Sequence, residues 1–204
     1  MAIRQPIPPR PPPSFALLLA APCATYADIG IRPGIIGEDN RKPVETQGPP
    51  WTAIGQVNIG GYRTTFACTG VLIAPQVVLT AAHCVTDPRT KRPFDPKDIH
   101  FAAGVRRDTV LGRSVAECVK LPDGFRYIGP ERFVADLPIQ WVPFEHFVLD
   151  LAVIVLADDI PAAAVAPVLR HDVFDVGLPL IHASYPKDRR YMLTADESCR
   201  ALDR

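Results

Sequence analysis

Short runs rich in Val, Ile, Thr and aromatic residues recur along the chain, and Gly, Pro, Asp or Asn stands between most of them. Runs of this kind, bounded by turn residues, predict β-strands. We expect strands over residues 52–58, 62–73, 76–80, 99–103, 109–121, 149–156 and 180–185. The 23 Pro and 13 Gly residues interrupt the chain too often for long helices. The pattern therefore predicts an all-β sandwich or barrel.

The amino-terminal residues follow a different pattern. Arg4 and Arg10 precede an apolar run at residues 15–21, and small residues follow it. This three-part order predicts a signal peptide over residues 1–27, and hence a secreted or periplasmic protein. A polyproline tail or a wrongly chosen start codon is the alternative interpretation of the proline-rich residues 6–13. No other stretch reaches the roughly 18 uninterrupted apolar residues of a membrane span, so we expect no membrane association of the mature form.

The composition is that of an ordinary globular protein. With 204 residues, 48% of them hydrophobic, the chain can bury the core of one two-lobed domain or of two domains. Lys+Arg and Asp+Glu number 22 each, so the formal net charge is zero. Without a basic excess, nucleic acids and anionic membranes are poor candidate partners.

The cysteines bear on the compartment and on metal binding. They are Cys23, Cys68, Cys84, Cys118 and Cys199. If Cys23 leaves with the signal peptide, an even number remains, which suits an oxidising compartment. No pair has the C-x-x-C spacing, and none combines with histidine at zinc-finger distances, so we do not expect a structural metal site.

The segment from Phe66 to Val85 carries the most informative motif. A strand-like run ends in Thr80-Ala-Ala-His-Cys84, and Cys68 precedes it. The segment resembles the chymotrypsin-like serine proteases, whose catalytic histidine lies in such a T-A-A-H-C sequence. The resemblance implies that His83 is the general base and that Cys68 and Cys84 form a disulfide worth roughly 3 kcal/mol, which pins the histidine turn. Taken alone, His83 would be interpreted as a core or surface histidine.

A second element follows the same family. The run from Phe147 to Leu156 resembles the family's D-(I/L)-A-(L/V) strand, and Asp150 begins it. The resemblance implies that Asp150 orients His83 and stabilises the imidazolium that forms during the reaction. Without His83 nearby, Asp150 would be interpreted as a charged residue capping an apolar strand.

Further matches narrow the resemblance to a subgroup. Residues 38–43 and 50–57 are similar to the start of bacterial extracellular members related to glutamyl endopeptidases. Tyr185-Pro186 resembles the G-Y-P strand that opens the family's second lobe, although Ser184 stands where Gly is usual. The resemblance implies a polypeptide substrate, and it implies no cofactor and no metal.

The family's fold consists of two six-stranded antiparallel β-barrels, and we expect the second to be incomplete here. On this basis residues 28–204 form a trypsin-like serine protease domain. The first barrel would span about residues 35–156, a crossover about 157–176, and a partial second barrel about 177–204.

The family's nucleophile segment, G-D-S-G-G, is missing from the sequence. The candidate serines are Ser14, Ser114, Ser184 and Ser198; Ser198 has an acid nearby but no flanking glycines that would expose its hydroxyl on a tight turn. We therefore expect a chain truncated before the nucleophile and inactive as given. A second lobe without its closing strands would expose unpaired backbone groups and favour aggregation.

Several matters stay open from the sequence. Cys199 would lack its usual partner, so it either pairs with Cys118 or stays free. The alternative function is a non-catalytic, protease-like binding or scaffold module. The sequence does not determine the cleaved bond, the activation cleavage site or the oligomeric state.

Overall fold

The computed structural model describes residues 38–45, 48–62, 64, 66–128, 148–160 and 175–201. The chain divides into two compact units, Met1–Asp39 and Asn40–Arg204, and the fold described below is that of the second. The expected signal peptide lies outside the described residues, as do most of the expected crossover and the candidate Ser14.

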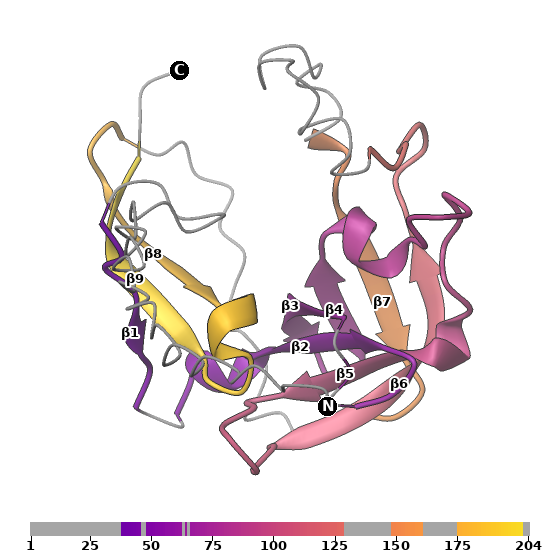
Figure 1. The fold of residues 1–204 in the computed structure, drawn as a ribbon, viewed down its shortest axis with the longest axis horizontal. Helices are drawn as coiled ribbons and strands as arrows, with labels where there is room; N and C mark the ends of the chain where they lie inside the picture. Colours follow the sequence, from indigo (N-terminus) through magenta and orange to yellow (C-terminus); the bar gives the residue numbers. More distant parts are fainter. Residues whose placement is uncertain are drawn as a thin grey trace, which may run out of the picture. The chain divides into compact units, whose positions relative to one another are not determined.

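The fold is all-β, and its main body is a closed six-stranded antiparallel barrel with the strand order β2-β3-β4-β7-β6-β5. Its strands are β2 (Ile54–Ile59), β3 (Ala67–Ala74), β4 (Val77–Thr80), β5 (Ile99–Ala103), β6 (Gly112–Lys120) and β7 (Ala152–Leu156). In Figure 1 their colours run from violet for β2 to orange for β7. β7 closes the barrel because it pairs with β4 on one side and β6 on the other.

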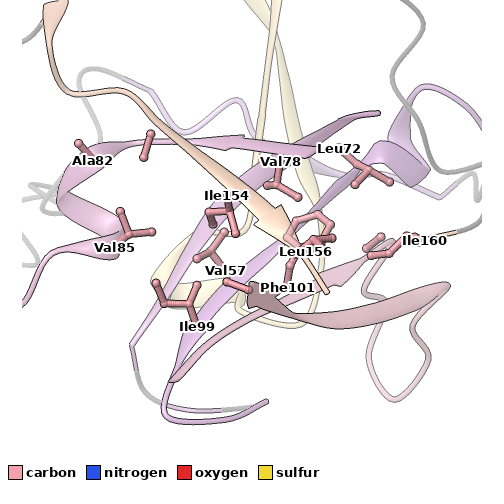
Figure 2. Packing of buried hydrophobic residues seen from close by; sticks show 13 residues of the cluster. Val57, Leu72, Val78, Ala82, Val85, Ile99, Phe101, Ile154, Leu156 and Ile160 are labelled. Atoms are coloured by element: carbon pink, nitrogen blue, oxygen red, sulfur yellow. The ribbon is translucent and has the colours of Figure 1, made fainter. Parts of the chain in front are cut away.

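The barrel interior is filled by side chains that alternate along the strands. On β7, Ala152, Ile154 and Leu156 are buried, whereas the residues between them are partly exposed. Figure 2 shows this cluster, which includes Val57, Leu72, Val78, Ile99, Phe101, Ile154 and Leu156, all fully buried. A closed sheet with a two-residue period buries one face of every strand, which explains why the strand-like runs were recognisable from the sequence.

A smaller antiparallel sheet follows the barrel in the sequence. Its order is β1-β9-β8, with β1 at Lys42–Pro43, β8 at Pro179–Ser184 and β9 at Thr194–Arg200. This partial sheet carries exposed apolar side chains: Ile181 on β8 is 55% exposed. A minor cluster lies between this sheet and the outer face of the barrel, in which Tyr185 and Leu193 pack with Ala102 and Val105.

Short 3-10 helices connect the strands: η1 (Trp51–Ala53), η2 (Ala82–Val85), η3 (Pro96–Asp98) and η6 (Lys187–Arg189). Each of the seven sequence-predicted strands overlaps an observed one, while β1 and β9 were not predicted. Within the described ranges, no helix has the length and apolar character that crossing a membrane requires.

Candidate active site

His83 is presented by the 3-10 turn η2, which follows β4 directly. Ala82 and Val85 in this turn are fully buried in the barrel core, so their packing holds the turn against the barrel. The Thr86 hydroxyl donates a hydrogen bond to the Ala82 carbonyl at 2.8 Å, which closes the turn. His83 is the residue of η2 that faces solvent, and its side chain is 52% exposed.

Asp150 reaches the same place through the pairing of β4 with β7. Thr80 pairs with Ala152 at the end of this antiparallel ladder. If this antiparallel register is extended by two residues, forward from Thr80 and backward from Ala152, Ala82 lies opposite Asp150. The barrel therefore brings together two side chains that are 67 residues apart in the sequence.

The Asp150 carboxylate makes two hydrogen bonds to His83. Oδ1 accepts from the backbone N–H of His83 at 2.8 Å, and Oδ2 lies 2.7 Å from Nδ1. Because a carboxylate can only accept, Nδ1 is the nitrogen that donates, and in the neutral ring Nε2 has the lone pair. The backbone hydrogen bond was not predicted from the sequence, because nothing in the motif specifies which atoms meet the second carboxylate oxygen.

A disulfide joins Cys68 on β3 to Cys84 in η2, as the resemblance implied. The two residues are 16 positions apart, with a Cα–Cα distance of 6.0 Å. Cys84 directly follows His83, so the cross-link ties the histidine turn to the neighbouring strand. The Nε2 atom of His83 lies 3.4 Å from Cys84 Sγ.

The same three residues form a group of metal-ligand type. Among the described residues, a ligand atom each from Cys68, His83 and Cys84 lies within 4.8 Å of the others. Both sulfur atoms are bonded to each other in the disulfide, and a disulfide sulfur is not a thiolate ligand. In the oxidised protein this group therefore offers a cation only the imidazole.

The candidate serines within the described residues lie elsewhere. Ser114 is buried, and its hydroxyl accepts a hydrogen bond from the Asp158 backbone at 2.9 Å. Ser198 lies on β9, and its hydroxyl donates to Asp196 Oδ1 at 2.5 Å. Ser184 ends β8. Of these described serines, none hydrogen-bonds to His83.

The partner of Cys199, left open by the sequence, is not Cys118. Both are free cysteines in the structure, Cys118 on β6 and Cys199 on β9. Each is only partly exposed.

Comparison with known proteins finds one matching family model and similar folds among solved structures. The family model "Trypsin" matches residues 35–117. The structure is similar to that of a Glu endopeptidase in complex with MPD, with a TM-score of 0.61 and 22% identity over 83% of this chain and 71% of that one. It is also similar to the Vibrio cholerae VesB protease, with a TM-score of 0.53 and 18% identity over 77% of this chain and 43% of that one. No curated protein matches the sequence.

Proposed function

We propose that His83 and Asp150 are two members of the His/Asp/Ser triad of a serine endopeptidase. Residues 35–117 belong to the trypsin-like serine protease family, and the fold is chymotrypsin-like. One observation carries the proposal. Asp150 Oδ2 lies 2.7 Å from Nδ1 of His83, which leaves Nε2 as a proton acceptor on a half-exposed ring. A general base needs this combination of a fixed tautomer and access to the proton that it removes.

In the proposed reaction, Nε2 of His83 takes the proton of a serine hydroxyl as that oxygen attacks the carbonyl carbon of the scissile peptide bond. Asp150 holds the ring in place and stabilises the imidazolium, and His83 then returns the proton to the leaving amine. The second hydrogen bond, from the His83 backbone to Oδ1, fixes the carboxylate so that Oδ2 stays directed at the ring. The reaction uses side chains, backbone donors and water.

The 204 residues by themselves supply only the base and its positioning group. They contain no G-D-S-G-G segment, which in the family provides both the nucleophile and the oxyanion donors. We therefore propose that this chain alone hydrolyses no peptide bond at a measurable rate. Polypeptides are the proposed substrates, and the Glu endopeptidase similarity makes peptides with a glutamyl residue at the cleaved bond the first to test.

The disulfide indicates an extracytoplasmic location, because such bonds persist in oxidising compartments. We propose more specifically that the protein is secreted or periplasmic. Export depends on residues 1–27, and expression with and without these residues, followed by fractionation, tests it.

The experiment that tests the function begins with the nucleotide sequence downstream of the codon for Arg204, read in all three frames. A glycine-flanked serine codon there would allow the longer product to be expressed and assayed on casein and on glutamyl peptides. In that product, His83→Ala should lower kcat/KM by at least about 10⁴-fold, the size known for triad members in this protease class. His182→Ala, a histidine exposed on β8, is the matched control and should leave the rate unchanged. Full activity of the His83 variant would reject the assignment.

A second candidate function is a protease-like binding or scaffold module without catalysis. The observation that favours it is the missing nucleophile segment. It predicts that the 204-residue chain is monodisperse and stable, and that no glycine-flanked serine is encoded in any downstream frame. Extensive aggregation of the refolded chain would count against it.

A further inference from the structure

A cavity of about 220 Å³ lies on the side of the barrel that does not carry His83 and Asp150, and neither of these residues lines it. Its lining includes polar and aromatic side chains, namely Gln56, Asn58, Tyr62, Arg107, Arg113 and Tyr191. In the ring of six strands, β2 pairs with β5, and this pair lies across the barrel from β4 and β7, which position the dyad. The cavity is therefore separate from the candidate active site.

Two buried amide side chains from β2 line the cavity. Gln56 and Asn58 flank Val57, and because side chains alternate along a strand, they lie on the outer face while Val57 fills the core. They are only 3% and 1% exposed. Among the described residues, Asn58 Oδ1 has no hydrogen-bond partner. A buried acceptor without a donor is unfavourable, so this oxygen would gain from a ligand N–H. The terminal torsion of asparagine is broad and allows the oxygen to turn toward the cavity.

Two arginines make the lining positively charged. Arg107 and Arg113 are exposed, and the ion pairs found among the described residues include neither of them. The Arg113 guanidinium lies 5.2 Å from the centre of the Tyr62 ring, which packs edge-on against His100. Asp108 is the acidic residue of the lining, so two arginines and one aspartate leave one net positive charge. This charge suits a single carboxylate better than a phosphate dianion.

The backbone of Arg107 is in the left-handed region, with φ of 52°. A residue with a Cβ adopts this conformation at a cost, whereas glycine adopts it freely. Two hydrogen bonds of 2.9 Å between Arg106 and Thr109 close the hairpin, and the Arg107 N–H donates to the Tyr191 carbonyl at 2.6 Å. Strained residues held by several contacts cluster at functional sites. The strain therefore points to a role for Arg107 in binding rather than in stability.

We propose that this cavity binds an acidic segment of a polypeptide, with a glutamate or aspartate carboxylate held by Arg107 and Arg113 and a backbone N–H donated to Asn58. Guanidinium groups bind carboxylates through parallel hydrogen bonds, and Arg and Tyr are enriched among the residues that dominate protein–protein binding. The volume is below the roughly 300–1,000 Å³ of small-molecule sites, so it suits side chains of a peptide segment rather than a cofactor.

The consequence for catalysis rests on the proposed function. A polypeptide that docks an acidic segment in this cavity would stay bound while another part of it reaches His83. The site would therefore lower KM for long acidic substrates and leave short peptides, which cannot span the two places, unaffected.

The test is peptide binding by the full 204-residue chain, which does not depend on proteolysis. Monodisperse chain from size exclusion is added to fluorescein-labelled hexaglutamate, and fluorescence anisotropy measures the Kd. We expect saturable binding, with hexaglutamine bound at least about 10-fold more weakly because it lacks the charge. Inorganic phosphate at the concentration of the peptide should not displace hexaglutamate. Displacement by phosphate would indicate a general anion site and would overturn the assignment to a peptide.

Variants locate the binding within the cavity. Arg113→Ala and Arg107→Gly should each weaken hexaglutamate binding about 10-fold. Arg107→Gly should also be at least as stable as the parent in urea, because glycine adopts the left-handed backbone without strain, so its loss of binding is not a loss of fold. Arg89→Ala is the matched control, since it removes the same charge from an exposed residue outside the cavity and should bind like the parent.

Three results would overturn the proposal: no binding by the parent chain, unchanged binding in both cavity variants, or an equal loss in Arg89→Ala. Each would leave the proposed protease function intact, because the experiment measures no hydrolysis.

Discussion

The closed barrel and the partial sheet illustrate two ways in which strands of similar length are stabilised. In the barrel, every strand from β2 to β7 has a hydrogen-bonded neighbour on both sides, and the interior is one continuous apolar cluster. In the partial sheet, β8 has a paired neighbour on one side only among the described residues, and its Ile181 faces solvent. A strand edge of this kind presents unpaired backbone groups, which favour pairing with other chains.

The difference matters for function because all parts of the proposed dyad belong to the barrel. η2 follows β4, Asp150 precedes β7, and the disulfide reaches back to β3. The geometry of His83 and Asp150 therefore depends on the part of the molecule with the larger core. We therefore expect the hydrogen bond between His83 and Asp150 to be kept when changes in the partial sheet cause chains to associate with one another.

The largest effect should come from emptying the barrel core. Ile154 on β7 is fully buried, so Ile154→Ala should lower the free energy of unfolding by about 3 kcal/mol. Ile181→Ala on β8 is the matched control, and because that side chain is exposed, a change within about 0.5 kcal/mol is expected. Urea unfolding followed by fluorescence measures both. Equal losses of unfolding free energy in the two variants would show that the barrel and the partial sheet do not differ in how much they depend on buried side chains.

Overfilling the barrel should have a somewhat smaller effect. A Cβ atom at Gly55 would lie 2.4 Å from the Ala102 carbonyl oxygen and 2.5 Å from the Phe101 ring. Gly55→Ala should therefore cost about 1–3 kcal/mol. Gly48 has nothing within 4 Å of an added Cβ, so Gly48→Ala should be close to neutral in the same unfolding measurement. A tolerated alanine at position 55 would mean that β2 and β5 approach less closely than the structure shows.

A third change tests the link between the two regions. The Tyr185 hydroxyl, at the end of β8, donates to the Val105 carbonyl at 3.0 Å, while its backbone N–H donates to the Thr69 hydroxyl at 2.9 Å. Tyr185→Phe removes the first bond and leaves the second, and it should cost about 1 kcal/mol. Hydrogen exchange should then increase in β8 and β9 more than in the barrel.

The same residue predicts a response to alkaline pH. Burial raises the pKa of Tyr185 well above its ordinary value of 10.0. Above that value the unfolded chain loses the phenol proton while the folded chain keeps it, so the stability present at lower pH is lost as the pH rises. The melting temperature should fall more between pH 9 and 11 in the parent chain than in Tyr185→Phe. An identical fall in both would argue that the hydroxyl is not buried.

The barrel was largely predictable because its physical origin is local and repetitive. Short runs rich in Val, Ile, Thr and aromatic residues, bounded by turn residues, predict strands, and all seven predicted ranges overlap one. β9 escaped prediction because Thr194–Arg200 is mostly polar, with burial confined largely to its first residues. A strand held by its two neighbours rather than by a buried face leaves no hydrophobic pattern in the sequence.

The candidate site was predictable as a set of residues and not as a set of contacts. The T-A-A-H-C motif predicted His83 and the cross-link of Cys68 with Cys84, and the later strand predicted Asp150; the structure contains the cross-link. The 3.4 Å approach of Nε2 to a cystine sulfur depends on the ring orientation set by Asp150, which only the folded barrel defines. This contact therefore has no signature in the cysteine spacing.

The smallest expected effect concerns an ion pair at the partial sheet. Arg41, just before β1, donates to both carboxylate oxygens of Asp188 in η6, at 3.2 and 3.0 Å, and these hydrogen bonds lower the pKa of Asp188 below its ordinary 3.8. A lowered pKa means that the stabilisation is present at neutral pH and is lost as the pH falls below 3.8. Because the Asp188 side chain is 47% exposed, Asp188→Asn should cost at most about 0.5 kcal/mol, and less in high salt. Urea midpoints at pH 7 and pH 3, at low and high ionic strength, measure this. A loss as large as that of Ile154→Ala would mean that the partial sheet depends on its surface charges as strongly as the barrel depends on its core.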